Sequence, residues 1–286
     1  MSLSSLYLDA FVGVAKAQSF SGASRELHIT QSALSQRIKN LEDSLGLTVF
    51  LRTSGGIKLT EQGQKLLRYC QTKDSLEQEL IDDLHVNTTN EISGVIRIGA
   101  YSSILRSAVI PSLSELLKAN SKILCEFQDR QVEDLAAMLN CGEVDFIIMD
   151  HKLEKANLEF EFLGQETFVV IENTKGFGRK DVFLDNNYKD RTTESFFRLQ
   201  QGNKEKYRRS YFDDCYGIIQ GVEMGLGRAV MPSHLIKNNK SIRVSKDFKE
   251  LKQDVFLHYH FQPIYSKLHQ SIISELKTNM VSKYLK

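Results

Sequence analysis

Residues 29–46, ITQSALSQRIKNLEDSLG, predict a single helix with two unlike faces. Apolar residues recur at intervals of three and four, the spacing that places them on one stripe of a helix: Leu34, Ile38, Leu41 and Leu45. Small polar and basic residues occupy the opposite side: Ser32, Ser35, Gln36 and Lys39. A helix that needs only solubility usually carries Glu and Lys there, so these short hydrogen-bonding side chains indicate a binding face.

Two shorter helices are predicted before this one. Apolar residues in 3–15 follow helical spacing, and Ser19 or Ser21 can cap a short helix whose inward positions include Ala23. Thr30 then caps the quoted helix after a short turn. Two helices joined in this way form a helix-turn-helix pattern, in which the second member is the recognition helix.

The chain after the recognition helix predicts a hairpin. Two short apolar runs flank Ser54-Gly55-Gly56, where glycine permits the positive φ angles of a tight turn. A hairpin in this place is a wing.

A long helix is predicted to follow the wing. Residues 60–86 contain no proline and are rich in Leu, Glu, Gln and Lys. An imperfect apolar seam runs along them: Leu66, Tyr69, Cys70, Leu76, Leu80 and Leu84. A helix between two compact regions cannot bury such a seam alone, so we expect it to pair with the same helix of a second chain.

From residue 92 the pattern alternates between strands and helices, which predicts a parallel α/β sheet. The expected strands are 94–100, 122–129 and 144–150, with further ones at 168–173, 181–186, 228–232 and 253–261. The expected helices are 102–120, 132–142 and, at the end, 267–280.

The polar face of the recognition helix suits the major groove of DNA. Ser, Gln and Lys offer donors and acceptors to base edges and phosphates. Arg52 and Lys58 on the wing can reach a phosphate or the minor groove, or can be solvated surface charges. Arg37, nearer the apolar stripe, can contact DNA or bridge to Glu42 or Asp9. The alternative to DNA binding is a plain three-helix bundle with a solvated face.

In the α/β region, Ser102 and Ser103 stand between a predicted strand and helix. Backbone N–H groups and hydroxyls there suit a carboxylate or phosphate, although the same residues can be simple helix caps. Gly225 and Gly227 resemble part of a dinucleotide fingerprint, but a strand-like segment follows them and the context fails.

Metal binding and catalysis have little support in the sequence. His258 and His260 share a strand face without further ligands spaced near them. No catalytic order of Ser, His and Asp is evident, so we expect neither an enzyme nor a cofactor.

Composition limits the classes of protein further. The four cysteines lack zinc or disulfide spacing, which fits free thiols in a reducing compartment. No apolar stretch is long enough to cross a membrane and no leader pattern is evident, so a cytoplasmic location is expected. Residues 1–69 hold eight Lys and Arg against five Asp and Glu, a local charge of +3 that permits a polyanion partner.

Taken together, these motifs resemble the LysR-type transcriptional regulators along nearly the whole chain. Residues 10–53 followed by LTEQGQKLL (59–67) resemble the family's winged helix-turn-helix and the start of its linker helix. GVIRIGAYSS, PSLSELL, CGEVDFII and GVEMGLGRAVMP stand where the family's effector domain has its landmarks. ITQSALSQRIKNLE, TEQGQKLL and LHYHF are most similar to the arginine- and lysine-responsive branch, also described as chromosome-initiation inhibitors.

The resemblance implies two α/β lobes of the periplasmic-binding-protein type, joined by two crossovers, with a small effector between them. Residues matching the family's DNA contacts are Gln31, Ser32, Ser35, Gln36 and Arg52. Residues matching its effector site are Ser102, Ser103, Gln128, Asp129, Asp214 and Cys215. The chain departs from the pattern in a short second-lobe segment, 172–232, which includes the polar run QQGNKEKYRRSYFDDC.

The predicted architecture is therefore an all-α winged helix-turn-helix domain (1–60), a linker and dimerisation helix (61–89) and an effector domain (90–286). Lobe I is expected at about 92–165 and 262–286, and lobe II at about 166–261. The expected partners are double-stranded DNA, a small effector and further copies of the chain, in a homodimer and a homotetramer; no membrane is expected. If Asp129 and Asp214 face the cleft, a basic amino acid is favoured, with its carboxylate at Ser102 and Ser103.

Two other classes of protein remain as alternatives. A solute-binding protein or small-ligand enzyme on the same lobes would show a secretion signal or catalytic residues, and no recognition face. A non-specific nucleoid-type binder would bind unrelated DNA equally and would carry a more basic N-terminal domain.

Overall fold

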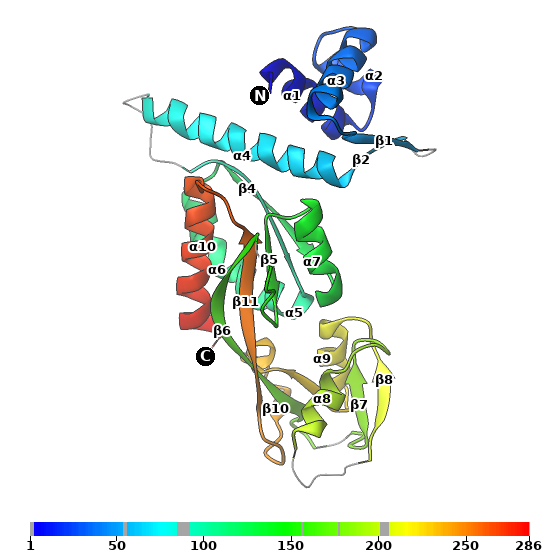
Figure 1. Ribbon diagram of the computed structural model, residues 1–286. Helices are drawn as coiled ribbons and strands as arrows, with labels where there is room; N and C mark the ends of the chain where they lie inside the picture. The colour runs from blue at the N-terminus through cyan, green and yellow to red at the C-terminus, as the bar shows by residue number, and fades with distance from the viewer. Residues whose placement is uncertain are drawn as a thin grey trace.

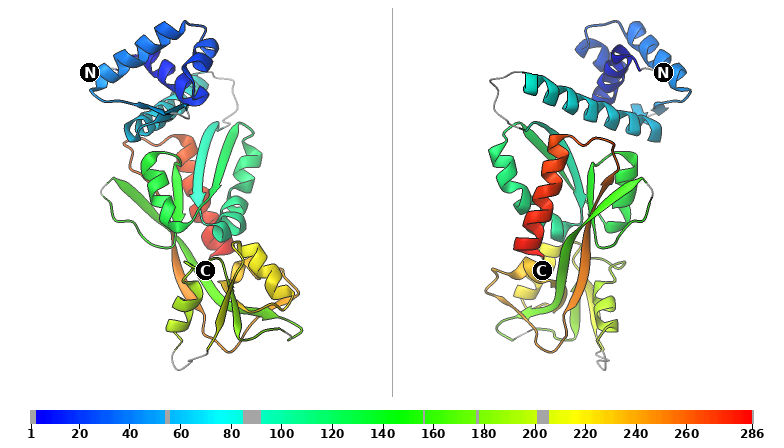
Figure 2. Two further views of the ribbon diagram at one scale, coloured as in Figure 1. Left: turned by 90° about the vertical axis from the view of Figure 1, so that its right-hand side faces the viewer. Right: turned by 60° about the vertical axis from the view of Figure 1, so that its left-hand side comes forward.

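The computed structural model describes residues 3–53, 56–84, 92–155, 157–176, 178–200 and 206–285. A small helical domain lies at one end, a long helix runs beneath it, and a larger α/β domain extends away from that helix (Figures 1 and 2). Within the described residues, no helix is both long and apolar enough to cross a membrane.

The N-terminal domain is a winged helix-turn-helix. Its elements are α1 (Ser5–Ala17), α2 (Phe20–Glu26), α3 (Gln31–Leu45), β1 (Phe50–Thr53) and β2 (Gly56–Leu59). The predicted caps are confirmed: the Ser19 hydroxyl accepts from Gly22 N–H, and the Thr30 hydroxyl accepts from Ala33 N–H. The apolar stripe of α3 is buried against α1 and α2, which explains why its polar face points outward.

The long helix α4 (Glu61–Leu84) is joined closely to this domain. Thr60 caps it by accepting from Gly63 N–H, and Cys70 is buried in the same core as α1 and α3. Other residues of the predicted seam are less covered: Leu66 and Leu76 are half-buried, and Tyr69 and Leu80 are 51% and 59% exposed. The predicted continuation over 85–89 lies outside the described residues.

One seven-stranded sheet runs through the α/β domain in the order β10-β6-β11-β5-β3-β4, with β9 also paired to β6. The parallel strands are β3 (Gly94–Ala100), β4 (Ile123–Asp129) and β5 (Phe146–Met149). The antiparallel ones are β6 (Leu158–Asn173), β9 (Ala229–Pro232), β10 (Ile242–Val244) and β11 (Leu251–His260). The expected parallel sheet is confirmed for β3, β4 and β5, but not beyond them, because β11 inserts between β5 and β6 in the opposite direction.

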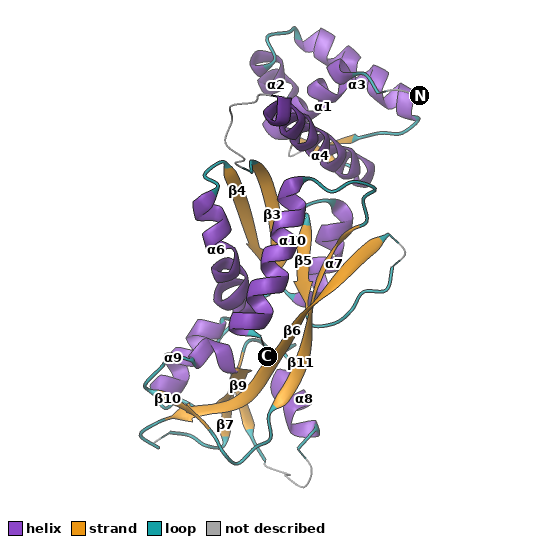
Figure 3. Ribbon diagram, turned by 90° about the vertical axis from the view of Figure 1, so that its left-hand side faces the viewer, coloured by secondary structure: helices purple, strands orange, loops and turns teal. Residues whose placement is uncertain are grey.

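The long strands β6 and β11 pass from one end of this domain to the other and form its two crossovers (Figure 3). We call the part around β3, β4 and β5 lobe I. The part around β7 (Val182–Asp185), β8 (Arg208–Tyr211), β9 and β10 is lobe II. The segment expected as a short strand at 168–173 is the second half of β6, so the strand is continuous across the boundary that we expected at residue 165.

Helices cover both faces of each lobe. In lobe I, α6 (Ile110–Ala119) and α10 (Lys267–Asn279) pack on one face, and α7 (Val132–Cys141) packs on the other. In lobe II, α9 (Cys215–Glu223) and α8 (Thr192–Arg198) pack in separate apolar clusters. Two short helical segments lie outside these layers: the 3-10 helix η2 (Ser233–Ile236) and the π-helix η3 (Met280–Tyr284), which directly follows α10.

The helix expected at 102–120 is not regular. It consists of α5 (Ser102–Ile104), the π-helical turn η1 (Leu105–Val109) and α6. A π-turn inserts one residue into a helix and shifts the directions of the side chains beside it. This irregularity lies at the end of lobe I that meets lobe II.

Candidate DNA-binding face and interlobe site

Helix α3 lies in the helical domain, at the far end of the molecule from the α/β lobes (Figure 1). Gln31, Ser32, Gln36 and Lys39 are exposed, and Ser35 is half-buried. The opposite stripe packs inward: Leu34 and Leu41 have 0% exposure, and Leu45 at its end is half-buried. The structure thus gathers these five predicted DNA contacts on one open surface.

Hydrogen bonds hold the middle of this face in place. The Gln36 amide donates to Asn40 Oδ1 at 2.8 Å, and the Asn40 amide donates to the Tyr7 hydroxyl at 3.3 Å. At the start of α3, the hydroxyls of Thr30 and Ser32 lie 3.0 Å apart. Gln36 and Ser32 are therefore oriented by the domain before any ligand arrives.

The wing places its two cations on neighbouring strands. Arg52 on β1 pairs through its backbone with Ile57, and Lys58 on β2 pairs with Leu51. Lys58 is exposed.

Arg37 is half-buried and, among the described residues, forms no ion pair with Glu42 or Asp9. Glu42 Oε1 instead accepts from Val49 N–H at 2.8 Å and Phe50 N–H at 3.4 Å. The carboxylate of Glu42 therefore orders the approach to the wing rather than neutralising Arg37.

In the α/β domain, residues of both lobes meet at what we call the interlobe site: Ser102, Arg106, Asp129, Cys215 and Tyr216. Cys215 Sγ, at the start of α9 in lobe II, lies 3.8 Å from Ser102 Oγ in lobe I. Arg106 Nη2 lies 3.9 Å from Asp129 Oδ2, and its Cζ lies 5.2 Å from the centre of the Tyr216 ring. Burial raises the pKa of the Cys215 thiol, which favours its neutral form.

The other predicted effector residues are differently placed. Asp214 Oδ2 caps α9 by accepting from Gly217 N–H at 2.9 Å. Gln128 precedes Asp129 on β4 and its amide approaches the Glu143 carbonyl at 3.5 Å, because successive strand residues point to opposite faces. The Ser103 carbonyl accepts from the Ser107 hydroxyl one turn along the helix. Ser102, Asp129 and Cys215 thus come together with Arg106 and Tyr216, while Gln128 points away.

A buried polar network beside this site was not foreseen from the sequence. Glu166 Oε1 on β6 lies 2.7 Å from His234 Nε2, and its Oε2 accepts from the Tyr101 hydroxyl at 2.7 Å. His234 Nδ1 lies 2.9 Å from Ser107 Oγ. Burial and the nearby Glu166 carboxylate raise the pKa of Tyr101 well above its usual value. The network connects lobe I, a crossover strand and lobe II.

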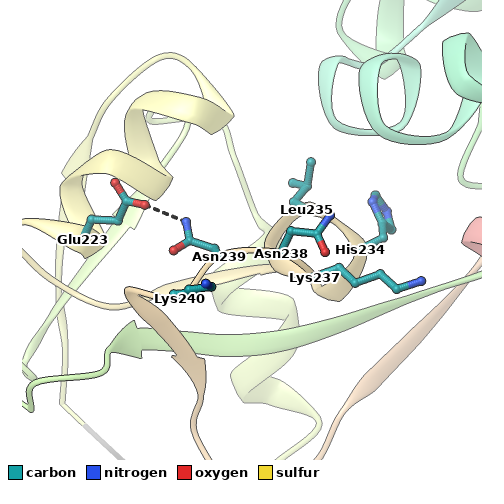
Figure 4. Close-up of a pocket in the computed structure, with 7 residues that line it drawn as sticks. All are labelled: Glu223, His234, Leu235, Lys237, Asn238, Asn239 and Lys240. Atoms are coloured by element: carbon teal, nitrogen blue, oxygen red, sulfur yellow. Dashed lines mark hydrogen bonds between the residues drawn. The ribbon is translucent and has the colours of Figure 1, made fainter.

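His234 also borders a pocket on lobe II (Figure 4). The pocket has a volume of about 410 Å³ and is lined by Glu223, His234, Leu235, Lys237, Asn238, Asn239 and Lys240. Glu223 Oε1 accepts from the Asn239 amide at 2.6 Å and closes one side. All of the lining residues belong to lobe II, so this pocket is distinct from the interlobe site.

The long helix α4 contacts lobe I of its own chain. Arg68 donates to the carbonyls of Leu139 at 3.1 Å and Asn140 at 3.3 Å, at the carboxyl end of α7. Gln71 Oε1 accepts from Arg97 Nη1 on β3 at 2.9 Å. The helix that follows the winged helix-turn-helix domain is therefore attached to the lobe that holds Asp129.

The two strand histidines serve structural contacts. His258 is fully buried and its Nε2 accepts from Leu153 N–H at 2.9 Å; burial lowers its pKa to about 4. His260 Nε2 lies 3.0 Å from the Leu139 carbonyl. Within the residues that the structure describes, no three His, Cys, Asp or Glu side chains gather as metal ligands would.

Comparison with known proteins agrees with both parts of this arrangement. Residues 7–64 match the bacterial regulatory helix-turn-helix protein, lysR family, and residues 89–177 match the LysR substrate binding domain. The HTH-type transcriptional regulator ShiR of Corynebacterium glutamicum is 30% identical over 168 residues, which are 58% of this chain and 56% of ShiR. The chain thus aligns with somewhat more than half the length of this curated relative.

Solved structures show the same fold over the full chain. ArgP from Mycobacterium tuberculosis superposes with a TM-score of 0.79 at 18% identity, covering 99% of both chains. LysG from Corynebacterium glutamicum, solved with the bound effector Arg, gives a TM-score of 0.73 at 18% identity, covering 98% of both. With both modules matched in order and this architecture shared, the chain belongs to the LysR family of bacterial helix-turn-helix regulatory proteins.

Proposed function

We propose that this protein is a sequence-specific, DNA-binding transcriptional regulator whose activity is modulated by a small effector held between its two lobes. The observation that carries the DNA-binding part is the outer face of α3, where a packed apolar stripe holds an open row of hydroxyl, amide and ammonium groups outward. The proposed contacts are Gln31, Ser32, Ser35, Gln36, Lys39 and Arg52. In this proposal the protein is not an enzyme, and its DNA partner places it in the cytoplasm.

The chemistry of these groups assigns them different tasks. A glutamine amide can form two hydrogen bonds with one edge of an adenine base, and the Gln36 amide is already oriented by Asn40. The serine hydroxyls suit bases or phosphates, whereas Lys39 and Arg52 suit phosphates. We therefore expect sequence discrimination from Gln36 and salt-dependent affinity from the two cations.

Gel-shift titration of a promoter fragment tests this assignment with Gln36→Ala and Arg52→Ala. We expect Gln36→Ala to lose about 1–3 kcal/mol of preference for specific over unrelated DNA. Arg52→Ala should weaken binding to all sequences and lower the salt slope by about one. Gln270→Ala is the matched control, because Gln270 is also exposed on a helix and also bonded through its amide, at 2.8 Å to the Tyr265 carbonyl.

Unchanged affinity and salt dependence in both variants would refute the DNA-contact assignment. Equal affinity of the wild-type chain for unrelated DNA would instead favour a non-specific nucleoid-type binder.

The proposed effector site comprises Ser102, Ser103, Gln128, Asp129, Asp214 and Cys215. The contact of Ser102 with Cys215 across the lobes supports it, as does the position of Asp129 beside them. We propose a basic amino acid as effector, and the bound Arg of the LysG structure supports that class. A thermal-shift screen of amino acids tests it: a response to another metabolite and none to lysine or arginine would contradict the class.

We also propose self-association through residues 61–89, with the winged helix-turn-helix at 1–60 and the effector domain at 90–286. The exposed apolar side chains on α4 support pairing, and a tetramer would add contacts between effector domains. A Leu80→Glu variant should dissociate toward monomers in light-scattering chromatography. An unchanged mass would place the interface elsewhere.

A further inference from the structure

Arg106 lies at the junction of the two lobes and contacts both of them. It lies in the π-turn η1 of lobe I, and its guanidinium faces Asp129 of the same lobe at 3.9 Å. The same guanidinium lies over the Tyr216 ring of lobe II, 5.2 Å from the ring centre. Ser102 and Cys215 make another contact between the lobes beside it.

A carboxylate and an aromatic ring that both contact one guanidinium form a subsite for a cation. The carboxylate supplies charge, and the ring attracts a flat cation that stacks on it. Nothing in this chemistry depends on the guanidinium being part of the chain. A free guanidinium or ammonium would find the same two partners if Arg106 moved aside.

The Arg106 side chain can leave this position at a small cost in free energy. Its side chain is 53% exposed and that of Asp129 is 41% exposed, so water reaches both groups of the ion pair. Exposed ion pairs contribute about 0–1 kcal/mol, and exposed contacts of a cation with an aromatic ring contribute about 0.5–1 kcal/mol. Displacing Arg106 therefore costs little, and the π-turn carrying it is the irregular part of its helix.

We propose that Arg106 competes with the effector, because its guanidinium fills the subsite that the cationic group of the effector occupies when the effector binds. In the free protein its guanidinium occupies the subsite between Asp129 and Tyr216. A basic amino acid displaces it by placing its own guanidinium or ammonium group there. This inference rests on the proposed effector function and adds the ligand's charge, its subsite and the group that competes for it.

Competition of this kind predicts whether substitution of Arg106 strengthens or weakens effector binding. Removing the tethered cation leaves Asp129 and Tyr216 unoccupied, so Arg106→Gln should bind a free cation more tightly. If Arg106 instead bound the carboxylate of the effector, the same variant should bind more weakly. The two roles therefore give opposite results.

Loss of any positive charge near the site would also favour a cation, so the control must lose the same charge. Arg130 adjoins Asp129, but its guanidinium donates to the Asp129 backbone carbonyl at 2.8 Å. Arg130→Gln thus removes one charge from the same edge of lobe I while the Arg106 contacts remain. The ratio of the effector affinities of the two variants therefore separates the displacement of Arg106 from the general effect of losing one positive charge.

The experiment is calorimetric titration of the full-length wild type, Arg106→Gln and Arg130→Gln with L-arginine and with its uncharged isostere L-citrulline. We expect Arg106→Gln to bind L-arginine about two- to five-fold more tightly than Arg130→Gln, the range that an exposed pair can supply. L-citrulline should show no such gain. Tyr216→Leu should weaken L-arginine binding by a similar factor, because it removes the stacking face.

Weaker L-arginine binding by Arg106→Gln than by Arg130→Gln would overturn the proposal, and so would equal binding by the two. Absence of L-arginine binding by both wild type and Arg106→Gln at millimolar concentration would also overturn it. Gel shifts on the same preparations keep this outcome separate from the DNA-binding proposal, since neither arginine lies on the helical domain.

Discussion

Glu166 and His234 are joined by a 2.7 Å hydrogen bond although 68 residues separate them in the chain. Both side chains are buried, at 1% and 7% exposure, in a region where a crossover strand meets both lobes. Tyr101 and Ser107 of lobe I complete the network on either side. Since Tyr101 directly precedes Ser102, this network also fixes one flank of the interlobe site.

Substitution of Glu166 should therefore destabilise the α/β domain. Glu166→Gln removes the carboxylate that His234 and Tyr101 face. A buried polar group that loses its hydrogen-bond partner lowers the free energy of unfolding by about 1–3 kcal/mol. Glu172→Gln is the matched control, because Glu172 lies on the same strand but pairs with Arg243, whose side chain is 53% exposed. Urea unfolding should show a loss for Glu172→Gln of less than about 1 kcal/mol. Equal losses would mean that the network contributes nothing beyond an ordinary surface pair.

The attachment of α4 to lobe I can be tested at Arg68. Arg68→Met keeps much of the side-chain volume but removes both donors to the Leu139 and Asn140 carbonyls. We expect faster hydrogen exchange in the last turn of α7, since the capping donors are lost. Lys65→Met is the control, because Lys65 forms an ion pair with Glu61 one turn away on α4 itself. Unaltered exchange in α7 after Arg68→Met would show that α4 does not stabilise this helix end.

Gly63 should tolerate no side chain. A Cβ there would lie 2.1 Å from the Val49 backbone carbonyl oxygen, which cannot move without displacing the approach to the wing. Alanine improves helix propensity by only about 1 kcal/mol, so the clash outweighs this gain and Gly63→Ala should be destabilising. Gly46→Ala is the comparison, with open space and a φ of +67°, and should cost about 1 kcal/mol. Thermal unfolding should rank Gly63→Ala as much the more damaging.

Acid should destabilise the α/β domain through His258. Burial lowers its folded pKa to about 4 from the ordinary value of 6.5, so the folded state favours the neutral ring. Its contribution is complete above pH 6.5 and is lost as the pH falls toward 4, because the unfolded chain then binds the proton more readily. Between pH 6.5 and 4, the free energy of unfolding should fall by about 3 kcal/mol through His258.

Urea midpoints measured between pH 4 and 8 should fall less steeply for His258→Gln, whose amide oxygen can still accept from Leu153 N–H. His260 and His269 also have pKa values lowered by burial, so some acid sensitivity should remain in the variant. A pH profile identical to that of the wild type would exclude His258 as a source of the effect.

The sequence alone determined the elements that depend on local patterning. The stripe of α3, the caps at Ser19 and Thr30, and the order of helices and strands in lobe I all follow from residues within a few positions of one another. The face that we propose for DNA binding could be located from the sequence, because the single helix α3 carries five of its six proposed residues.

Only the tertiary structure decided the features that depend on distant pairing. Periodicity does not record a strand's direction or its partner, so the antiparallel insertion of β11 between β5 and β6 could not be read from the sequence. Arg106 and Tyr216, or Glu166 and His234, likewise carry no local signal of their contact. Their meeting depends on two crossover strands that bring the lobes together, because hydrogen bonding and stacking require a proximity that only the folded chain provides.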